Sequence, residues 1–221
     1  MSFDCYGTLV DWNGGMTAAL EQVVDGRAEA LLRAYHTHEM RVEATDPHLS
    51  YREVLAEGLR RAAEQESVEL AAGQEHVLAD SWGSLPVFPE VPAALDELRQ
   101  AGWRLAVLTN CDDDLFALTA PSLGVDLDEV VTAEQVRSYK PRLTHFEQFA
   151  RRSGAHPETW VHVANSWVLD MTAAARLGLP RVWVDRDRSG HDPSLATRVV
   201  SDLSGIAAVV EDAAIAPSRS N

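Results

Sequence analysis

The sequence predicts an α/β protein: a Rossmann-like parallel-sheet core into which a helical cap domain is inserted after the first strand. Three observations lead to this fold class. A short apolar run ends at Asp4, apolar residues then recur at helical spacing to about residue 85, and strands alternate with helices from Phe88 onward. Such alternation is typical of a parallel sheet covered by helices. We expect residues 1–11 and 87–221 to form the core and 12–86 to form the cap.

Each element follows from local periodicity and turn residues. In the cap, helices are predicted at 16–24, 28–40, 51–63 and 70–82. In the core, helices are predicted at 91–101, 115–123, 143–153 and 170–177, and strands at 104–109, 130–132, 160–164 and 181–184. Asp46 or Ser50 is expected to cap the helix that starts near Tyr51. The polar tail, residues 216–221, is expected to be mobile.

Composition limits the classes of function. A formal net charge of −15 argues against nucleic-acid binding, which needs a basic patch, and against attraction to anionic membranes. No apolar run is long enough to span a bilayer, and no signal peptide is visible, so the expected location is cytoplasmic. Cys5 and Cys111 are too few for a disulfide framework and are expected to be free, buried thiols.

The first candidate site lies where the first strand ends. Asp4 stands at the carboxyl end of that strand, the position at which α/β folds bind ligands. Gly7 lets the backbone turn closely beside it, and Thr8 adds a hydroxyl group. Trp12, just beyond, is a candidate for lining the pocket.

The run Asp4-Cys5-Tyr6-Gly7-Thr8-Leu9-Val10-Asp11 resembles the first motif of the haloacid dehalogenase-like hydrolases. The resemblance implies that Asp4 is a nucleophile that forms a covalent intermediate. Phosphatases of this superfamily carry a second aspartate two residues later, which protonates the leaving group. Tyr6 stands there instead, and this resembles the type II 2-haloacid dehalogenases, whose halide leaving group needs no proton.

Two further stretches resemble the second and third motifs. The strand that ends at Thr109 and Asn110 implies that Thr109 binds the substrate's anionic group and Asn110 holds the departing halide. The acidic run 112–114 that follows is as consistent with a helix N-terminus as with catalysis. Lys140, just before a proline, implies a cation beside Asp4, and we expect its charge to keep Asp4 ionised.

The fourth stretch, 160–171, resembles the motif that carries an acidic pair in phosphatases. Asn165 takes the first place of that pair and Asp170 the second. An Mg²⁺ site usually wants carboxylates, so the amide weakens a site built from Asp4 and Asp170. The resemblance therefore implies a reaction without a metal or other cofactor.

Three positions depart from the dehalogenase pattern. His36 stands where the family's cap supplies an arginine that grips halide or carboxylate, so His36 is a candidate for binding substrate. Phe146 and Trp167 replace a tyrosine and an asparagine, respectively.

The resemblance implies hydrolysis of a small 2-haloacid through an aspartyl ester on Asp4, with Asp170 and Lys140 aiding the attack of water. Two alternatives stay open: a phosphomonoesterase that uses Mg²⁺ through Asp4 and Asp170, and a catalytically weak relative that only binds small acids. The expected partner is a small anionic substrate, and the resemblance also implies a homodimer formed through the cap.

Overall fold

The computed structural model describes residues 1–215, so the tail at 216–221 lies outside the described residues. Its centre is a six-stranded parallel sheet in the order β3-β2-β1-β4-β5-β6, which confirms the predicted fold class. The strands are β1 (Ser2–Phe3), β2 (Ala106–Thr109), β3 (Glu129–Thr132), β4 (His162–Ala164), β5 (Arg181–Val184) and β6 (Arg198–Val200). Because β1 pairs with both β2 and β4, Asp4 leaves the sheet at its middle.

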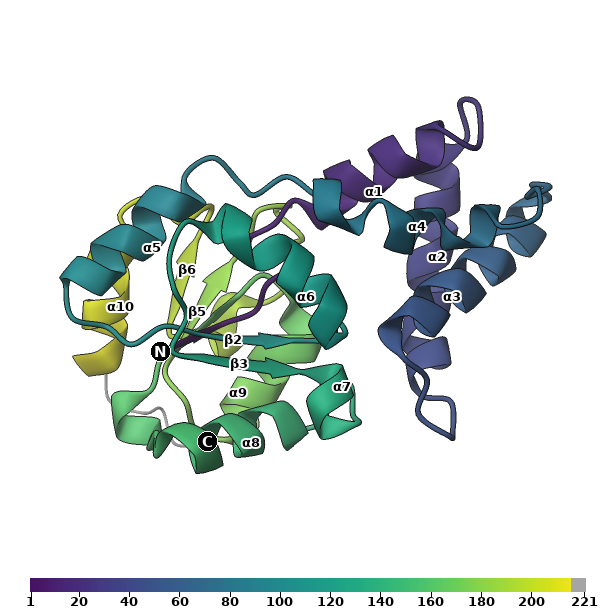
Figure 1. Ribbon diagram of the computed structural model, residues 1–221. Helices are drawn as coiled ribbons and strands as arrows, with labels where there is room; N and C mark the ends of the chain where they lie inside the picture. The colour runs from purple at the N-terminus through teal and green to yellow at the C-terminus, as the bar shows by residue number, and fades with distance from the viewer. Residues whose placement is uncertain (216–221) are drawn as a thin grey trace.

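Helices cover both faces of this sheet (Figure 1). They are α5 (Val91–Gln100), α6 (Asp113–Thr119), α7 (Ala133–Val136), α8 (Thr144–Ser153), α9 (Thr172–Arg176) and α10 (Ile206–Ile215). Residues alternate between two buried clusters along β2: Leu108 packs with Phe146, whereas Val107 belongs to the cluster on the other face. The sheet is therefore buried on both faces, which explains why its strands read as continuous apolar runs.

Four further helices follow β1 and lie together to one side of the sheet (Figure 1). They are α1 (Trp12–Glu21), α2 (Ala28–Glu43), α3 (Tyr51–Glu66) and α4 (Val77–Asp80). Ser50 caps α3 through a capping box with Glu53, as predicted. These helices are the inserted cap, while the bounds 12–86 stay a prediction.

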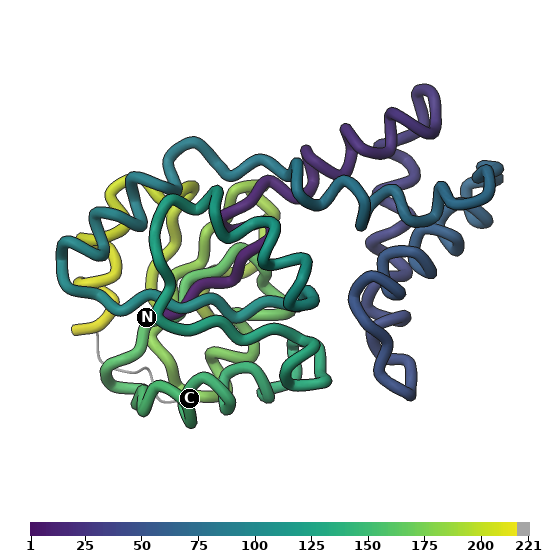
Figure 2. Tube along the Cα trace, in the orientation of Figure 1, coloured from purple at the N-terminus to yellow at the C-terminus, as the bar shows by residue number. Residues whose placement is uncertain are grey.

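Two linkers join the cap to the core, and they run next to each other (Figure 2). Val10 and Val87 form an antiparallel bridge, Asp11 N donates to Pro86 O at 2.8 Å, and Phe88 N donates to Leu9 O at 3.0 Å. The cap therefore leaves and rejoins the core at one place.

Several predicted elements were wrong in detail. The helix predicted at 70–82 is broken into Gln74–His76, α4 and Trp82–Ser84, and Gly73 precedes it with φ +91°. The helix predicted at 170–177 begins earlier, with a π-helical turn at Trp167–Met171 that continues into α9. The edge strand β6 and helix α10 were not predicted. Within residues 1–215, no helix is long and apolar enough to cross a membrane.

Candidate active site

Asp4 lies just past the end of β1 and is 7% exposed. The following turn needs Gly7, whose φ is +88°, a conformation that side-chain-bearing residues rarely adopt. This turn brings the hydroxyl of Thr8 back onto the aspartate, where it donates to Asp4 Oδ2 at 2.7 Å. Thr8 Oγ1 in turn accepts from the backbone N–H of Asn165 at 2.8 Å. The hydroxyl therefore fixes one side of the Asp4 carboxylate and ties it to the loop after β4.

Lys140 fixes the other side of that carboxylate. Its Nζ donates to Asp4 Oδ1 at 2.8 Å, to Asp170 Oδ1 at 2.7 Å and to the carbonyl of Leu108 at 2.9 Å. The side chain is 1% exposed, so all three ammonium protons are used inside the protein. Lys140 is also the only lysine in the sequence.

On the side away from the pocket, Asp170 contacts a buried chain of polar residues that the sequence did not indicate. His162 Nε2 lies 3.0 Å from Asp170 Oδ1, and His162 Nδ1 lies 2.8 Å from Ser2 Oγ, which accepts from Trp160 Nε1 at 2.6 Å. A neutral His162 that carries its proton on Nε2 satisfies this whole chain of donors and acceptors. Asp170 itself is fully buried and does not line the pocket above Asp4.

The two carboxylates that share Lys140 differ in pKa. Burial raises the pKa of Asp4, and the charge of Asp170 adds to this, although Lys140 pulls the other way. Lys140 acts to lower the pKa of Asp4, which is the direction expected from the sequence, while burial acts more strongly to raise it. Burial also acts to raise the pKa of Asp170, but Lys140 and His162 outweigh it and lower that pKa.

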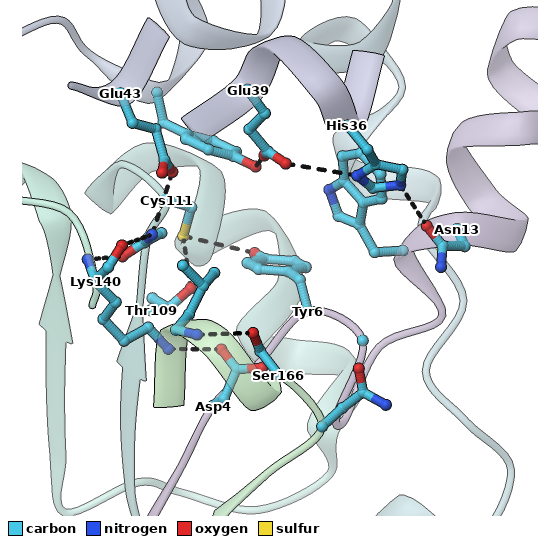
Figure 3. Close-up of a pocket in the computed structure, with 16 residues that line it drawn as sticks. Asp4, Tyr6, Asn13, His36, Glu39, Glu43, Thr109, Cys111, Lys140 and Ser166 are labelled. Carbon is cyan, nitrogen blue, oxygen red and sulfur yellow. Dashed lines mark hydrogen bonds and ion pairs between the residues drawn. The ribbon is translucent and has the colours of Figure 1, made fainter. Parts of the chain in front are cut away.

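A pocket of about 220 Å³ opens above Asp4, between core and cap (Figure 3). Among the predicted site residues, those that line it are Asp4, Tyr6, Trp12, His36, Thr109, Asn110, Lys140 and Asn165. Thr8 and Asp170 lie beneath its surface and act on it through Asp4 and Lys140. The structure therefore brings the predicted residues to one place.

The hydroxyl of Tyr6 is engaged away from Asp4. It accepts from Trp82 Nε1 at 2.8 Å and lies 2.9 Å from Thr119 Oγ1. Burial raises the pKa of this phenol well above its usual value. The Tyr6 hydroxyl is therefore poorly placed and poorly suited to protonate a leaving group at Asp4.

Asn110 and Asn165 are held by backbone groups. Asn110 Oδ1 accepts from Lys140 N at 2.8 Å, and its Nδ2 donates to Lys140 O at 3.4 Å and to Glu43 Oε1 at 3.1 Å. Asn165 Nδ2 donates to Val184 O at 2.9 Å. The second N–H of Asn110 thus meets a carboxylate of the cap, a contact that the sequence did not indicate.

The cap contributes acids rather than an arginine. Glu39 accepts from Tyr51 Oη at 2.6 Å and from Tyr35 Oη at 3.1 Å, and both Glu39 and Glu43 line the pocket. The side chain of His36 is 44% exposed and bonds to Asn13 Oδ1 at 3.0 Å. Arg33, on the same helix as His36, does not supply the missing arginine, because it is exposed and pairs with Glu29.

One acid of the run 112–114 connects core and cap. As the sequence allowed, the run stands at the start of α6, with Asp112 at the N-cap position. The Asp112 carboxylate makes no capping bond there and accepts from the backbone N–H groups of Tyr51 at 2.8 Å and Arg52 at 3.0 Å. Both donors lie in the first turn of α3, where free N–H groups favour an anion. Arg52 also pairs with Asp114 at 2.7 Å. These contacts hold the cap against the loop after β2.

Asp4 and Asp170 fit an Mg²⁺ ion poorly. The Lys140 ammonium already lies between them, and Asp170 is fully buried against His162. Across residues 1–215, no group of three His, Cys, Asp or Glu side chains is placed to hold a metal. Asn165 supplies only a neutral amide at the pocket.

Fold and site together define a hydrolase with a buried aspartate at the centre of an α/β sheet. The chain belongs to the haloacid dehalogenase-like hydrolases, a family that matches residues 1–178. Haloacetate dehalogenase H-2 of Moraxella sp. (strain B) is 25% identical, with 95% of this chain and 97% of that protein covered. Glyceraldehyde 3-phosphate phosphatase of Methanothermobacter thermautotrophicus is 32% identical over 45% of each chain. The solved L-2-haloacid dehalogenase of Xanthobacter autotrophicus with chloropropionic acid covalently bound shares the fold, with TM-score 0.82, 19% identity and coverage of 95% and 97%.

Proposed function

We propose that this protein hydrolyses the carbon–halogen bond of a small 2-haloacid through an aspartyl ester on Asp4. The observation that carries the proposal is the engagement of Tyr6 by Trp82 and Thr119, which leaves a nucleophile without a neighbouring acid. A halide can depart without a proton, whereas the alkoxide that leaves a phosphate ester needs one. Losing a general acid typically costs about 10²–10⁴-fold in rate.

In the first step, an oxygen of Asp4 bonds to the carbon that carries the halogen, and the halide leaves with the electron pair of the broken bond. Thr8 and Lys140 hold the two oxygens in fixed directions, so little reorganisation precedes attack. Asp170 acts through Lys140, because its own carboxylate does not reach the pocket.

In the second step, water adds to the carbonyl carbon of the Asp4 ester, and the 2-hydroxyacid leaves with the former Asp4 oxygen. A proton goes to solvent. Lys140 stabilises the negative charge that develops on the ester carbonyl oxygen, a role suited to a buried cation. The reaction closes with Asp4 restored, and it uses neither metal nor cofactor.

The test is halide release from L-2-chloropropionate with EDTA or with Mg²⁺, beside phosphate release from p-nitrophenyl phosphate. Halide release that ignores EDTA, and that Asp4→Asn abolishes, is expected. Under single turnover in H₂¹⁸O, the label should enter Asp4 and not the product. Label in the product, or substantial activity of Asp4→Asn, would exclude the ester on Asp4.

A phosphomonoesterase is the second candidate, favoured by the similarity to a phosphatase over nearly half the chain. Mg²⁺-dependent phosphate release without halide release would establish it. A relative that binds small acids without turning them over is the third, and binding of 2-chloropropionate without halide release would support it.

The assembly that we propose is a homodimer through the cap, with a small anionic substrate as the partner and no nucleic acid or membrane involved. Size-exclusion chromatography with light scattering tests the dimer, and a monomer at all concentrations would refute it.

A further inference from the structure

The cap side of the pocket carries carboxyl groups where a haloacid would need positive charge. Glu39 and Glu43 project from α2 toward the pocket, one helical turn apart, with Asp4 below them (Figure 3). Of the pocket-lining residues, Lys140 is the one with a permanent positive charge, and two carboxylates already share it. A substrate carboxylate would therefore enter a pocket whose cation is already paired.

Glu43 is also in direct competition with an anion. Its Oε1 accepts from Asn110 Nδ2 at 3.1 Å, and the other bond of that amide group goes to Lys140 O at 3.4 Å. An anionic group placed against Asn110 must displace the Glu43 carboxylate or lie beside it. A group with N–H donors meets no such conflict, because it can donate to Glu43 directly.

We propose that Glu43 is a specificity-determining residue that makes the site accept an uncharged 2-halo compound, a 2-haloamide, more readily than the 2-haloacid of the proposed function, which is turned over more slowly. This inference rests on the proposed dehalogenation at Asp4. The chemistry is the same: Asp4 displaces halide, water cleaves the ester, and the products are a 2-hydroxyamide, halide and a proton. The departing halide is common to both substrates, so the ratio of their rates isolates the charge of the substrate.

The discrimination depends on pH. Burial, together with the charge of Glu39, raises the pKa of Glu43 well above its usual value, whereas Asn110 and Lys140 act to lower it. The ionisable groups that face Glu43 are Glu39 and Tyr35 on α2, Tyr51 on α3, and Tyr139 and Lys140 on the loop before α8. A protonated Glu43 tolerates an anion, and an ionised one repels it. Preference for the amide therefore grows as the pH rises.

The experiment compares kcat/KM for halide release from 2-chloropropionamide and 2-chloropropionate at pH 6 and pH 9. Three proteins are used: the native chain, Glu43→Gln, and Glu29→Gln, which changes an exposed acid on the same helix. The native protein should favour the amide at least tenfold at pH 9 and less at pH 6. Glu43→Gln should lower that ratio at least tenfold and remove its pH dependence, whereas Glu29→Gln should leave it unchanged. A native preference for the acid at pH 9, or an unchanged ratio in Glu43→Gln, would overturn the proposal.

A second readout separates this inference from the proposed function. Propionamide and propionate have no halogen, and their binding to the native protein and to Glu43→Gln can be measured by ligand-observed NMR at pH 9. The amide should bind the native protein more tightly, and Glu43→Gln should remove the difference. If no halide is released from either substrate, dehalogenation fails while the binding ratio still decides charge selection. Equal binding of the two ligands to the native protein would refute the role of Glu43.

Discussion

Replacing Lys140 by methionine should strongly destabilise the protein, because it leaves two buried carboxylates without their shared cation. Asp170 is fully buried and Asp4 nearly so, and each accepts a charge-assisted hydrogen bond from Nζ. Removing one partner of a buried ion pair costs about 3–5 kcal/mol in the free energy of unfolding. For a chain of this length, that corresponds to a fall of about 6–20 °C in Tm.

The deficit, meaning the free energy of unfolding that Lys140→Met loses, should also depend on pH. Without Lys140, the native-state pKa of Asp4 rises further, and that of Asp170 rises above the unfolded value of about 3.9. A raised pKa contributes stability at low pH that is lost as the pH rises through it, so the deficit should be larger at pH 8 than at pH 5.

Urea unfolding followed by circular dichroism at both pH values measures the deficit. The matched control is Arg61→Met, which removes a cation from a half-exposed pair with Glu57 at 2.8 Å and should cost about 0.5 kcal/mol or less. A loss below about 1 kcal/mol in Lys140→Met at pH 8 would show that the carboxylates are not held as described.

Four further predictions concern the active site and its contact with the cap. Asp112→Ala should lower the free energy of unfolding by about 1–2 kcal/mol, because it removes the carboxylate that accepts from two N–H groups in the first turn of α3. Thermal unfolding measures this loss, and Asp114→Ala, which breaks an exposed pair with Arg52, should cost less. With 2-chloropropionamide, kcat/KM should fall on the acid side of its pH profile at a pH above the usual carboxyl pKa, since burial raises the pKa of Asp4. His162→Gln should move that acid limb to higher pH, because a weaker bond from residue 162 makes Asp170 attract Lys140 more strongly and so weakens the bond from Lys140 to Asp4. An unmoved limb would show that His162 does not influence the pKa of Asp4. Tyr6→Phe should leave halide release within about threefold, well below the 10²–10⁴-fold cost of losing a general acid, and a larger loss would mean that the hydroxyl takes part in catalysis.

Several of the residues that sequence reasoning located stand where a strand ends. Asp4, Thr109 and Asn165 each follow an apolar run, and parallel strands bring such positions to one edge of the sheet. Lys140 was located by its place in the series of motifs. These signals are local in sequence, and the topology alone makes them converge.

Residues whose role depends on a tertiary contact were not located. Glu43 lies in a helix whose charged positions read as a solvated surface, and only its contact with Asn110 reveals it. His162 alternates with buried apolar residues in β4, so the pattern indicates a core position and does not reveal the contact with Asp170. The contact of Asp112 could not be predicted either, because its partner is a cap helix far away in sequence.

Because Lys140 is the only lysine and is 1% exposed, the outer surface of the protein carries no ε-amine, and its cations are arginines. Acylating reagents need an uncharged, accessible amine, and the paired carboxylates keep the pKa of Lys140 raised as well. Apart from the amino terminus of the chain, an amine can therefore be acylated only after the core has opened. The rate at which Lys140 is acylated thus records how often the active site opens, with no label or probe added to the chain.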